Sequence, residues 1–155
     1  MLRRQPDLEV IYVPVGSGTG ACGALTIRDA LAPGYRIVGV QSAQAPAAHQ
    51  TWSTGEPPTV TPATRAAGLA TGSSFQDTQE IMRGLGYFIL VDDSEIDEAR
   101  VLLATRAHAL AEGAGPAALA GLLADHRAGK LVSRHCVMPV TGGNADTNEL
   151  ASLVR

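Results

Sequence analysis

A glycine-rich run follows the first apolar segment of the chain and has the chemistry of an anion-binding loop. The run reads EVIYVPVGSGTGACG from Glu9 to Gly23, with glycines at positions 16, 18, 20 and 23. Because glycine lacks a Cβ atom, such a loop can adopt positive φ and direct successive N–H groups toward an anion. A helix that begins near Ala21 would add its unpaired N–H groups and the positive end of its dipole. The pattern therefore predicts a site for the phosphate of a cofactor.

Three other interpretations of this run stay open at this point. The segment from Gly18 to Gly23 satisfies the dinucleotide pattern G-x-G-x-x-G, but that fold needs an acid at the end of the next strand, where VGVQS presents Gln41. A nucleoside triphosphate loop needs a lysine after its last glycine, and GSGTGACG has none there. The third interpretation is a tight strand-to-helix turn that binds no ligand.

Two more segments carry polar groups beside glycines. Thr141 ends the apolar run of VMPVTGGN, and a hydroxyl at the carboxyl end of a parallel strand faces the crevice in which such sheets bind ligands. Thr141 could therefore hydrogen-bond a flat heteroaromatic ring, although an ordinary turn explains the same residues. Glu112, in LAEGAG, lies in a glycine-lined break between two helical patterns. Taken alone, Glu112 is an exposed loop acid.

The elements that must position these residues alternate between strand and helix patterns. We expect strands at about Val10–Val15, Tyr35–Gln41, Tyr87–Val91 and His135–Val140, and helices at about Cys22–Leu31, Pro46–Trp52, Ser74–Leu85 with Ser74 as its cap, Asp92–Leu110 and Pro116–His126. The connection around Glu56 to Pro62 is expected to be irregular. This order predicts an α/β fold, a three-layer open and mostly parallel sheet with helices on both faces.

Length and composition limit the class of protein. The 155 residues predict a single α/β domain over 1–155. With a net charge of −3 and 17% charged residues, the chain carries no field that would attract nucleic acid or an anionic membrane, so the expected partner is a small molecule. The first ten residues are too short and too polar for a secretion signal, and no run approaches the roughly 20 apolar residues of a membrane span. We therefore expect a cytoplasmic protein.

The two cysteines do not suggest a metal site or a disulfide. Cys22 and Cys136 lie far apart and show neither CxxC nor Cys/His spacing, so both are expected to be buried thiols. Cys22 stands at the start of a helix beside the glycine-rich loop, which is a position that can lower the pKa of a thiol.

Five motifs follow one another in an order and spacing that extend over nearly the whole chain. They are VPVGSGTGACG, VGVQSAQAPA, GLATG, LAEGAGPAALAGLL and VTGGN. Together they resemble the carboxyl-terminal half of threonine/serine dehydratases, which are fold-type II pyridoxal-phosphate enzymes of the tryptophan synthase β-like superfamily. The resemblance implies the large-domain part of that fold, pyridoxal 5'-phosphate as cofactor, and a β-elimination that converts a hydroxyamino acid into a 2-oxo acid and ammonia. It also implies a homodimer.

The resemblance assigns roles to particular residues. It implies that main-chain N–H groups of the glycine-rich loop grip the coenzyme phosphate, at Gly16, Ser17, Gly18, Thr19 and Gly20. It implies that Thr141, which precedes Gly142 and Gly143, faces the pyridine nitrogen. A neutral hydroxyl there leaves that nitrogen largely unprotonated, which suits β-elimination. It places Glu112 close to the coenzyme ring.

Two departures from the family pattern bear on activity. Members that bind a divalent cation use acids where this chain has Gln41 and Ala47, so we expect no metal site. In the family, the Schiff-base lysine of S-x-K-x-R-G-A precedes the phosphate loop, whereas the only lysine here is Lys130, in a polar turn. We therefore expect no catalytic residue and no dehydratase activity in this chain alone, as in a truncated or divided enzyme.

The same departure leaves three functions open. The chain could complement a separate chain that carries the amino-terminal half and its lysine. It could instead be a non-catalytic phosphate- or nucleotide-binding module. The last alternative is a structural remnant that dimerises through an apolar sheet face.

Overall fold

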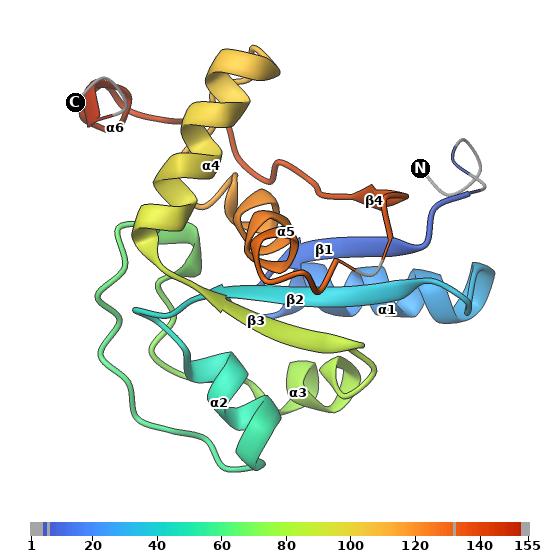
Figure 1. Cartoon of the computed structure of the whole chain (residues 1–155). Helices are drawn as coiled ribbons and strands as arrows, with labels where there is room; N and C mark the ends of the chain where they lie inside the picture. Colours follow the sequence, from blue (N-terminus) through green and yellow to red (C-terminus); the bar gives the residue numbers. More distant parts are fainter. Residues whose placement is uncertain (1–4, 6, 132, 153–155) are drawn as a thin grey trace.

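Short runs of branched aliphatic residues form a parallel four-stranded sheet in the computed structural model, which describes residue 5 and residues 7–131 and 133–152 (Figure 1). The strands are β1 (Val10–Pro14), β2 (Arg36–Ser42), β3 (Tyr87–Val91) and β4 (Cys136–Val137), in the order β3-β2-β1-β4. Val38 lies opposite Tyr12 on one side and Tyr87 on the other. Because every pairing is parallel, each connection must cross over the sheet.

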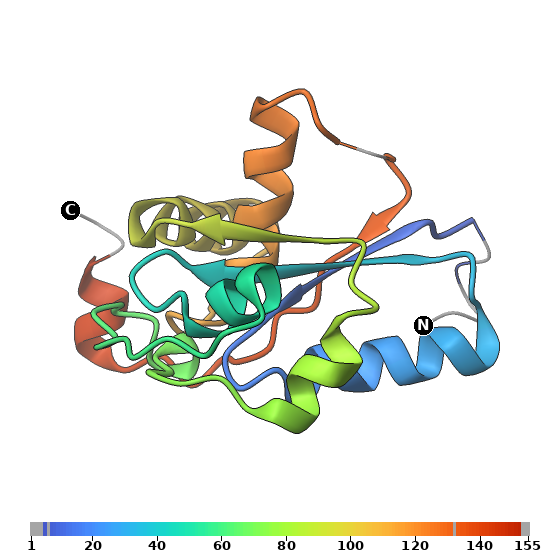
Figure 2. The ribbon, with the colours of Figure 1, turned by 90° about the horizontal axis from the view of Figure 1, so that it is seen from below.

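Helices cover both faces of the sheet. In Figures 1 and 2, the helices α1 (Thr19–Leu31), α2 (Ala47–Thr54) and α3 (Gln76–Met82) lie on one side, and α4 (Asp93–Arg106) and α5 (Ala117–Arg127) on the other. A 3-10 turn at Ala67–Leu69 and the short helix α6 (Thr147–Ser152) complete the described elements. The predicted three-layer α/β fold is confirmed. No helix within the described ranges is long and apolar enough to cross a membrane.

The core has two halves, because successive side chains of a buried strand point to opposite faces. Val10 and Tyr12 of β1 belong to the cluster that contains α4 and α5 residues, whereas Ile11 and Val13 belong to the cluster that contains α1 and α3 residues. All four side chains are buried. A continuous apolar strand is therefore required at β1, immediately before the glycine-rich loop.

A buried polar cluster ties α5 to the sheet. Asp125 of α5 is only 4% exposed, and its Oδ2 accepts hydrogen bonds from the hydroxyls of Tyr12 in β1, at 2.7 Å, and of Tyr87 in β3. Burial and these hydrogen bonds raise the pKa of Tyr12, and burial together with the Asp125 hydrogen bond raises the pKa of Tyr87 to about 12. Both phenols therefore stay protonated donors at neutral pH, and they satisfy a carboxylate that would otherwise be costly to bury.

The predicted boundaries are correct in the centre of the fold and less so at its edges. The predicted strand at Tyr87–Val91 coincides with β3, and the acids at the start of α4 form a capping box between Asp92 and Glu95. Helix α1 begins at Thr19, before the predicted Cys22, because Gly18 already takes the capping position. The Ser74 cap is wrong: α3 begins at Gln76 after Phe75, and Ser74 Oγ instead lies 2.8 Å from Thr51 Oγ1.

The remaining differences lie where the chain leaves the sheet. Helix α4 ends at Arg106, short of the predicted Leu110, and His108 then takes a positive φ of 52°. Strand β4 has only two residues where His135–Val140 was predicted, and Pro139 has no N–H group with which to extend the ladder. Helix α6 had no counterpart among the predicted elements.

Two helix-interior glycines should respond oppositely to alanine. A Cβ at Gly121 of α5 would collide with Val40 Cγ2, whereas a Cβ at Gly23 of α1 would meet nothing within 4 Å. We expect Gly121→Ala to lower the free energy of unfolding by about 1–3 kcal/mol, because the buried Val40 cannot move aside. Gly23→Ala should raise it by roughly 0.5–1 kcal/mol. Urea unfolding at constant m-value measures both, and equal stability of the two variants would contradict the seating of α5 on β2.

Candidate functional site

The glycine-rich loop is held in one conformation by α3. Gly18 has a φ of 98°, and a Cβ there would lie 2.9 Å from Met82 Cε and 3.1 Å from Thr78 Cβ. Thr78 Oγ1 also donates a hydrogen bond to Ser17 O at 3.0 Å. Both the positive φ and the close contact require glycine at position 18.

The loop has unused hydrogen-bond donors. The first N–H groups of any helix lack an acceptor in the preceding turn, and α1 starts at Thr19. Among the described residues, no acceptor is hydrogen-bonded to the N–H groups of Ser17, Gly18, Thr19 or Gly20. These donors and the helix start form the arrangement that binds phosphate in other folds.

A cavity of about 280 Å³ joins the loop to the other predicted residues. It is lined by Pro14, Gly16, Ser17, Gly18, Thr19, Gly20, Gly68, Leu69, Glu112, Ala114 and Thr141. All the predicted site residues except Gly142 therefore border one space. Gly142 lies directly behind it, since a Cβ at this position would collide with Glu112 Oε1. The volume is close to the lower limit of about 300 Å³ that is typical of small-molecule sites.

Small residues allow these segments to meet. A Cβ at Gly16 would lie 2.6 Å from Gly68 O, and a Cβ at Gly68 would lie 2.8 Å from the Cβ of Ala114. Thr71 Oγ1 donates a hydrogen bond to Gly16 O at 3.3 Å. The GLATG segment is thus packed between the phosphate-type loop and the break that contains Glu112.

The polar side chains in the cavity are a hydroxyl and a carboxylate beyond the loop itself. Thr141 is exposed, and its hydroxyl forms no hydrogen bond within the described part of the chain. Glu112 is half-buried and is the only charged residue among those that line the cavity. Its position in the break between α4 and α5 agrees with the prediction. The cavity thus offers amide donors for an anion and a neutral hydroxyl for a ring nitrogen.

Sequence reasoning assigned no site role to four of the lining residues, Pro14, Gly68, Leu69 and Ala114. Gly68 and Leu69 belong to GLATG, one of the motifs that carried the family resemblance. Its two glycines were a usable signal, because glycine pairs often mark places where another backbone approaches closely. Pro14 and Ala114 contribute surface and not chemistry.

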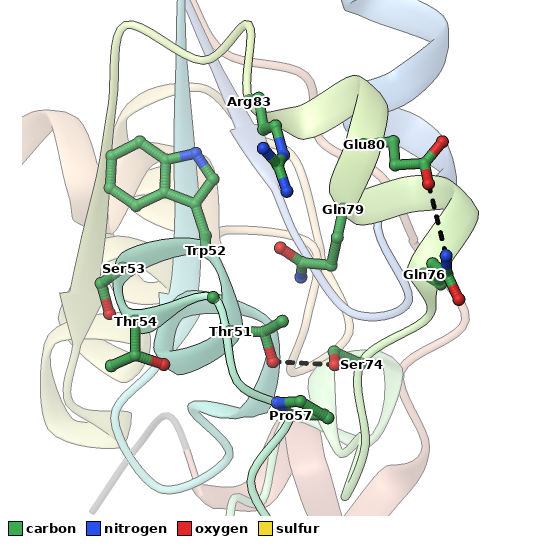
Figure 3. Close-up of a pocket in the computed structure, with 11 residues that line it drawn as sticks. Thr51, Trp52, Ser53, Thr54, Pro57, Ser74, Gln76, Gln79, Glu80 and Arg83 are labelled. Carbon is green, nitrogen blue, oxygen red and sulfur yellow. Dashed lines mark hydrogen bonds between the residues drawn. The ribbon is translucent and has the colours of Figure 1, made fainter.

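A larger cavity of about 620 Å³ lies between α2 and α3, away from all the predicted residues (Figure 3). Its polar groups already have partners: Trp52 Nε1 donates to Met82 O at 3.0 Å, and Gln79 Nε2 donates to Ala48 O at 3.0 Å. Thr51 and Ser74 face each other across it, as Figure 3 shows. Its charged residues, Glu80 and Arg83, are exposed. Because these groups leave no convergent unpaired donors or acceptors, we place the candidate site at the smaller cavity.

The position at which some dehydratases carry a metal-binding acid is internal in this chain. Gln41 is fully buried, and its Oε1 accepts a hydrogen bond from the N–H of His49 at 2.9 Å. Ala47 is buried as well. In the described ranges no group of three or more His, Cys, Asp or Glu residues could hold a metal ion. The absence of a metal from the functional protein stays a prediction.

The structure corrects the expectation for Cys22. Its side chain is buried beneath the loop, with Sγ 3.5 Å from Thr78 O, and burial raises the pKa of the Cys22 thiol. The lowered pKa suggested by its helix-start position is therefore wrong, because desolvation of the thiolate outweighs the helix dipole. Cys136 is half-buried, and burial raises its thiol pKa too.

Alkylation measures this directly. In a Cys136→Ser background, Cys22 should react with iodoacetamide more slowly than a free cysteine at pH 7.5, because the thiolate is the reactive form and little of it is present. The rate should still rise as the pH passes 9. The urea-unfolded chain is the control and should react at the ordinary rate. A rate that reaches its plateau below pH 8 in the folded chain would contradict the raised pKa.

Comparison with known proteins places this site in a family. The family model described as pyridoxal-phosphate dependent enzyme matches residues 1–142. An L-threonine ammonia-lyase from Geobacter sulfurreducens is 36% identical over 99% of this chain and 38% of its own length. Among solved structures, the threonine deaminase from the organism abbreviated T.th. has a TM-score of 0.83 at 28% identity, over 94% of this chain and 53% of that one.

A second structure supports the fold. The processed form of threonine deaminase isoform 2 from Solanum lycopersicum has a TM-score of 0.91 at 23% identity, over 99% of this chain and 43% of that one. This chain thus spans about two fifths to one half of the length of the relatives that it matches. The family match covers most of the residues and both ends of the cavity, so this chain belongs to the pyridoxal-phosphate dependent enzymes, whose cofactor is pyridoxal phosphate.

Proposed function

We propose that this chain is the cofactor-binding half of an ammonia-lyase that acts on L-threonine or L-serine. The observation that carries the proposal is the single cavity bordered by the loop amides, Glu112 and Thr141. The relatives named as threonine ammonia-lyase and threonine deaminase support the reaction class. The reaction would release ammonia and a 2-oxo acid.

The residues that would hold pyridoxal phosphate follow from their chemistry. The unpaired N–H groups of residues 17–20 would bind the phosphate, and the positive end of α1 would add to this attraction. The Thr141 hydroxyl would meet the pyridine nitrogen, and Glu112 would lie near the ring. When bound, the cofactor supplies an electron sink for the substrate carbanion. Gly142 would keep Glu112 in place, because any side chain at 142 would collide with the carboxylate.

Proton transfer at the substrate needs a base that this cavity lacks. Lys130, the only lysine in the 155 residues, is exposed in the turn after α5 and is not among the residues that line the cavity. Its main-chain N–H donates to Asp125 O at 2.9 Å, which fixes the turn on the side of the helix remote in sequence from Glu112. We therefore propose that this chain binds the cofactor but cannot turn over a substrate alone. A separate chain with the Schiff-base lysine would complete the enzyme.

A cytoplasmic location and a homodimer belong to the same proposal and rest on the family resemblance. The 16.0 kDa chain mass allows light scattering after size-exclusion chromatography to decide the oligomeric state.

Charge added inside the loop should abolish cofactor binding, while the same charge one turn later should not. Cβ atoms at Gly20 and Gly23 would both meet nothing within 4 Å, but only Gly20 lines the cavity. We expect Gly20→Asp to weaken binding of pyridoxal phosphate at least tenfold, because the carboxylate repels the phosphate at short range. Gly23→Asp is the matched control, with a change below about threefold because solvent screens the charge. Calorimetric titration measures both.

The same titration separates the lyase from a nucleotide-binding module. The unmodified chain should bind pyridoxal phosphate in preference to NAD and ATP. Preference for either nucleotide would overturn the proposal in favour of a module. Equal effects of the two aspartate variants would place the phosphate elsewhere.

Activity should depend on a supplied lysine. The purified chain with pyridoxal phosphate should release no measurable 2-oxo acid from L-threonine or L-serine. A second polypeptide that carries the S-x-K-x-R-G-A motif should restore it, and the same polypeptide with that lysine changed to alanine is the control. Turnover by this chain alone would refute the proposed division of labour.

A further inference from the structure

Three consecutive residues around Glu112 are fixed by three separate elements. Ala111 O accepts a hydrogen bond from Arg100 Nε of α4 at 2.9 Å. The N–H of Glu112 donates to Gly142 O at 3.2 Å, and the N–H of Gly113 donates to Glu149 Oε1 of α6 at 2.8 Å. The main chain on both sides of the Glu112 side chain is therefore held from outside the cavity.

Arg100 and Glu149 act on this segment together. Arg100 is only 3% exposed, and its Nη2 lies 3.8 Å from Glu149 Oε1, the same oxygen that accepts the Gly113 N–H. Nη2 is fully enclosed and has no hydrogen-bond partner among the described residues. A buried guanidinium needs a nearby opposite charge, so it favours the position of the Glu149 carboxylate.

Helix α6 presents this carboxylate in a defined orientation. The Glu149 N–H donates to Asp146 Oδ1 at 2.8 Å, and the Asp146 N–H donates to Glu149 Oε2 at 3.2 Å. This reciprocal pair is a capping box that leaves Oε1 for the Gly113 N–H. A Cβ at Gly113 would lie 3.1 Å from that oxygen, so the lack of a side chain there permits the contact.

Other charges around the pair are matched elsewhere. Arg65, Asp93 and Asp97 line the same hollow of about 250 Å³. Arg65 pairs with Asp97 at 2.5 Å and lies 3.7 Å from Asp93. Glu149 is thus the carboxylate that faces Arg100 from the side of the Glu112 segment.

We propose that Arg100 and Glu149 are positioning residues that set the place of Glu112 in the cofactor cavity. The inference rests on the proposed function, because Glu112 matters only where that cavity binds pyridoxal phosphate. It also makes α6 part of the site, since this helix reaches the cavity through Gly113. Neither residue touches the cavity itself.

The test uses the full chain and two measurements. Glu149→Ala removes the acceptor of the Gly113 N–H, and we expect amide hydrogen exchange at Gly113 to become about tenfold faster without cofactor. Titration with pyridoxal phosphate should then show binding weakened about three- to tenfold. Glu149→Gln retains an acceptor oxygen, so it should restore most of the Gly113 protection.

Glu98→Ala is the matched control, because Glu98 pairs with Arg127 at the surface, away from the Glu112 segment. It should change neither measurement. Thermal unfolding of each variant verifies that the chain is folded, and a purely structural role for Glu149 would accelerate exchange throughout the chain and not selectively at residues 111–113.

The outcomes separate this inference from the proposed function. Unchanged exchange at Gly113 in Glu149→Ala overturns the positioning role. Faster exchange with unchanged affinity for pyridoxal phosphate overturns the link between this contact and the cavity. If the unmodified chain binds no pyridoxal phosphate, the proposed function fails, and the positioning role in the cavity fails with it.

Discussion

The structure depends on main-chain segments that approach one another more closely than side chains would permit. Gly16 lies against Gly68 O, Gly68 against Ala114, and Gly142 against the Glu112 carboxylate. These contacts bring a loop with unpaired N–H groups, an acid and a hydroxyl to one cavity, although they come from distant parts of the sequence. Each approach is enforced by the absence of a Cβ. The site is consequently built from backbone, and its chemistry tolerates little change at these glycines.

The sheet makes this convergence possible. Parallel strands present their carboxyl ends at one edge, so the loop after β1 and the segment after β4 meet there. The break that holds Glu112 is placed by α5, which Gly121 seats on Val40 and Asp125 ties to Tyr12 and Tyr87. Packing on the α5 face thus controls the cavity at a distance. A loss of stability there would also change the position of Glu112.

Much of this was predictable, because the loop, the strands β1 to β3 and the break at Glu112 are each specified by local sequence. What local sequence could not give are the contacts between distant segments. Ser74 looks like a helix cap, but its hydroxyl pairs with Thr51, which lies in another helix. Cys22 occupies a helix start, but burial under Thr78 decides its pKa. Arg100 and Glu149 are 49 positions apart in the sequence (149 − 100), and no motif links them.

Binding and reaction are separable in this arrangement because they use different groups. Holding a phosphate and a ring nitrogen requires fixed amides and a neutral hydroxyl, which the cavity supplies from residues 17–20 and Thr141. Removing a proton from a substrate carbon requires a basic group of matched pKa within reach, and the only lysine lies in an exposed turn outside the cavity. The amide donors retain their geometry without that base, because α3 and the GLATG segment hold them. A chain of this kind can therefore present a finished cofactor site to a partner that contributes only the reacting amine.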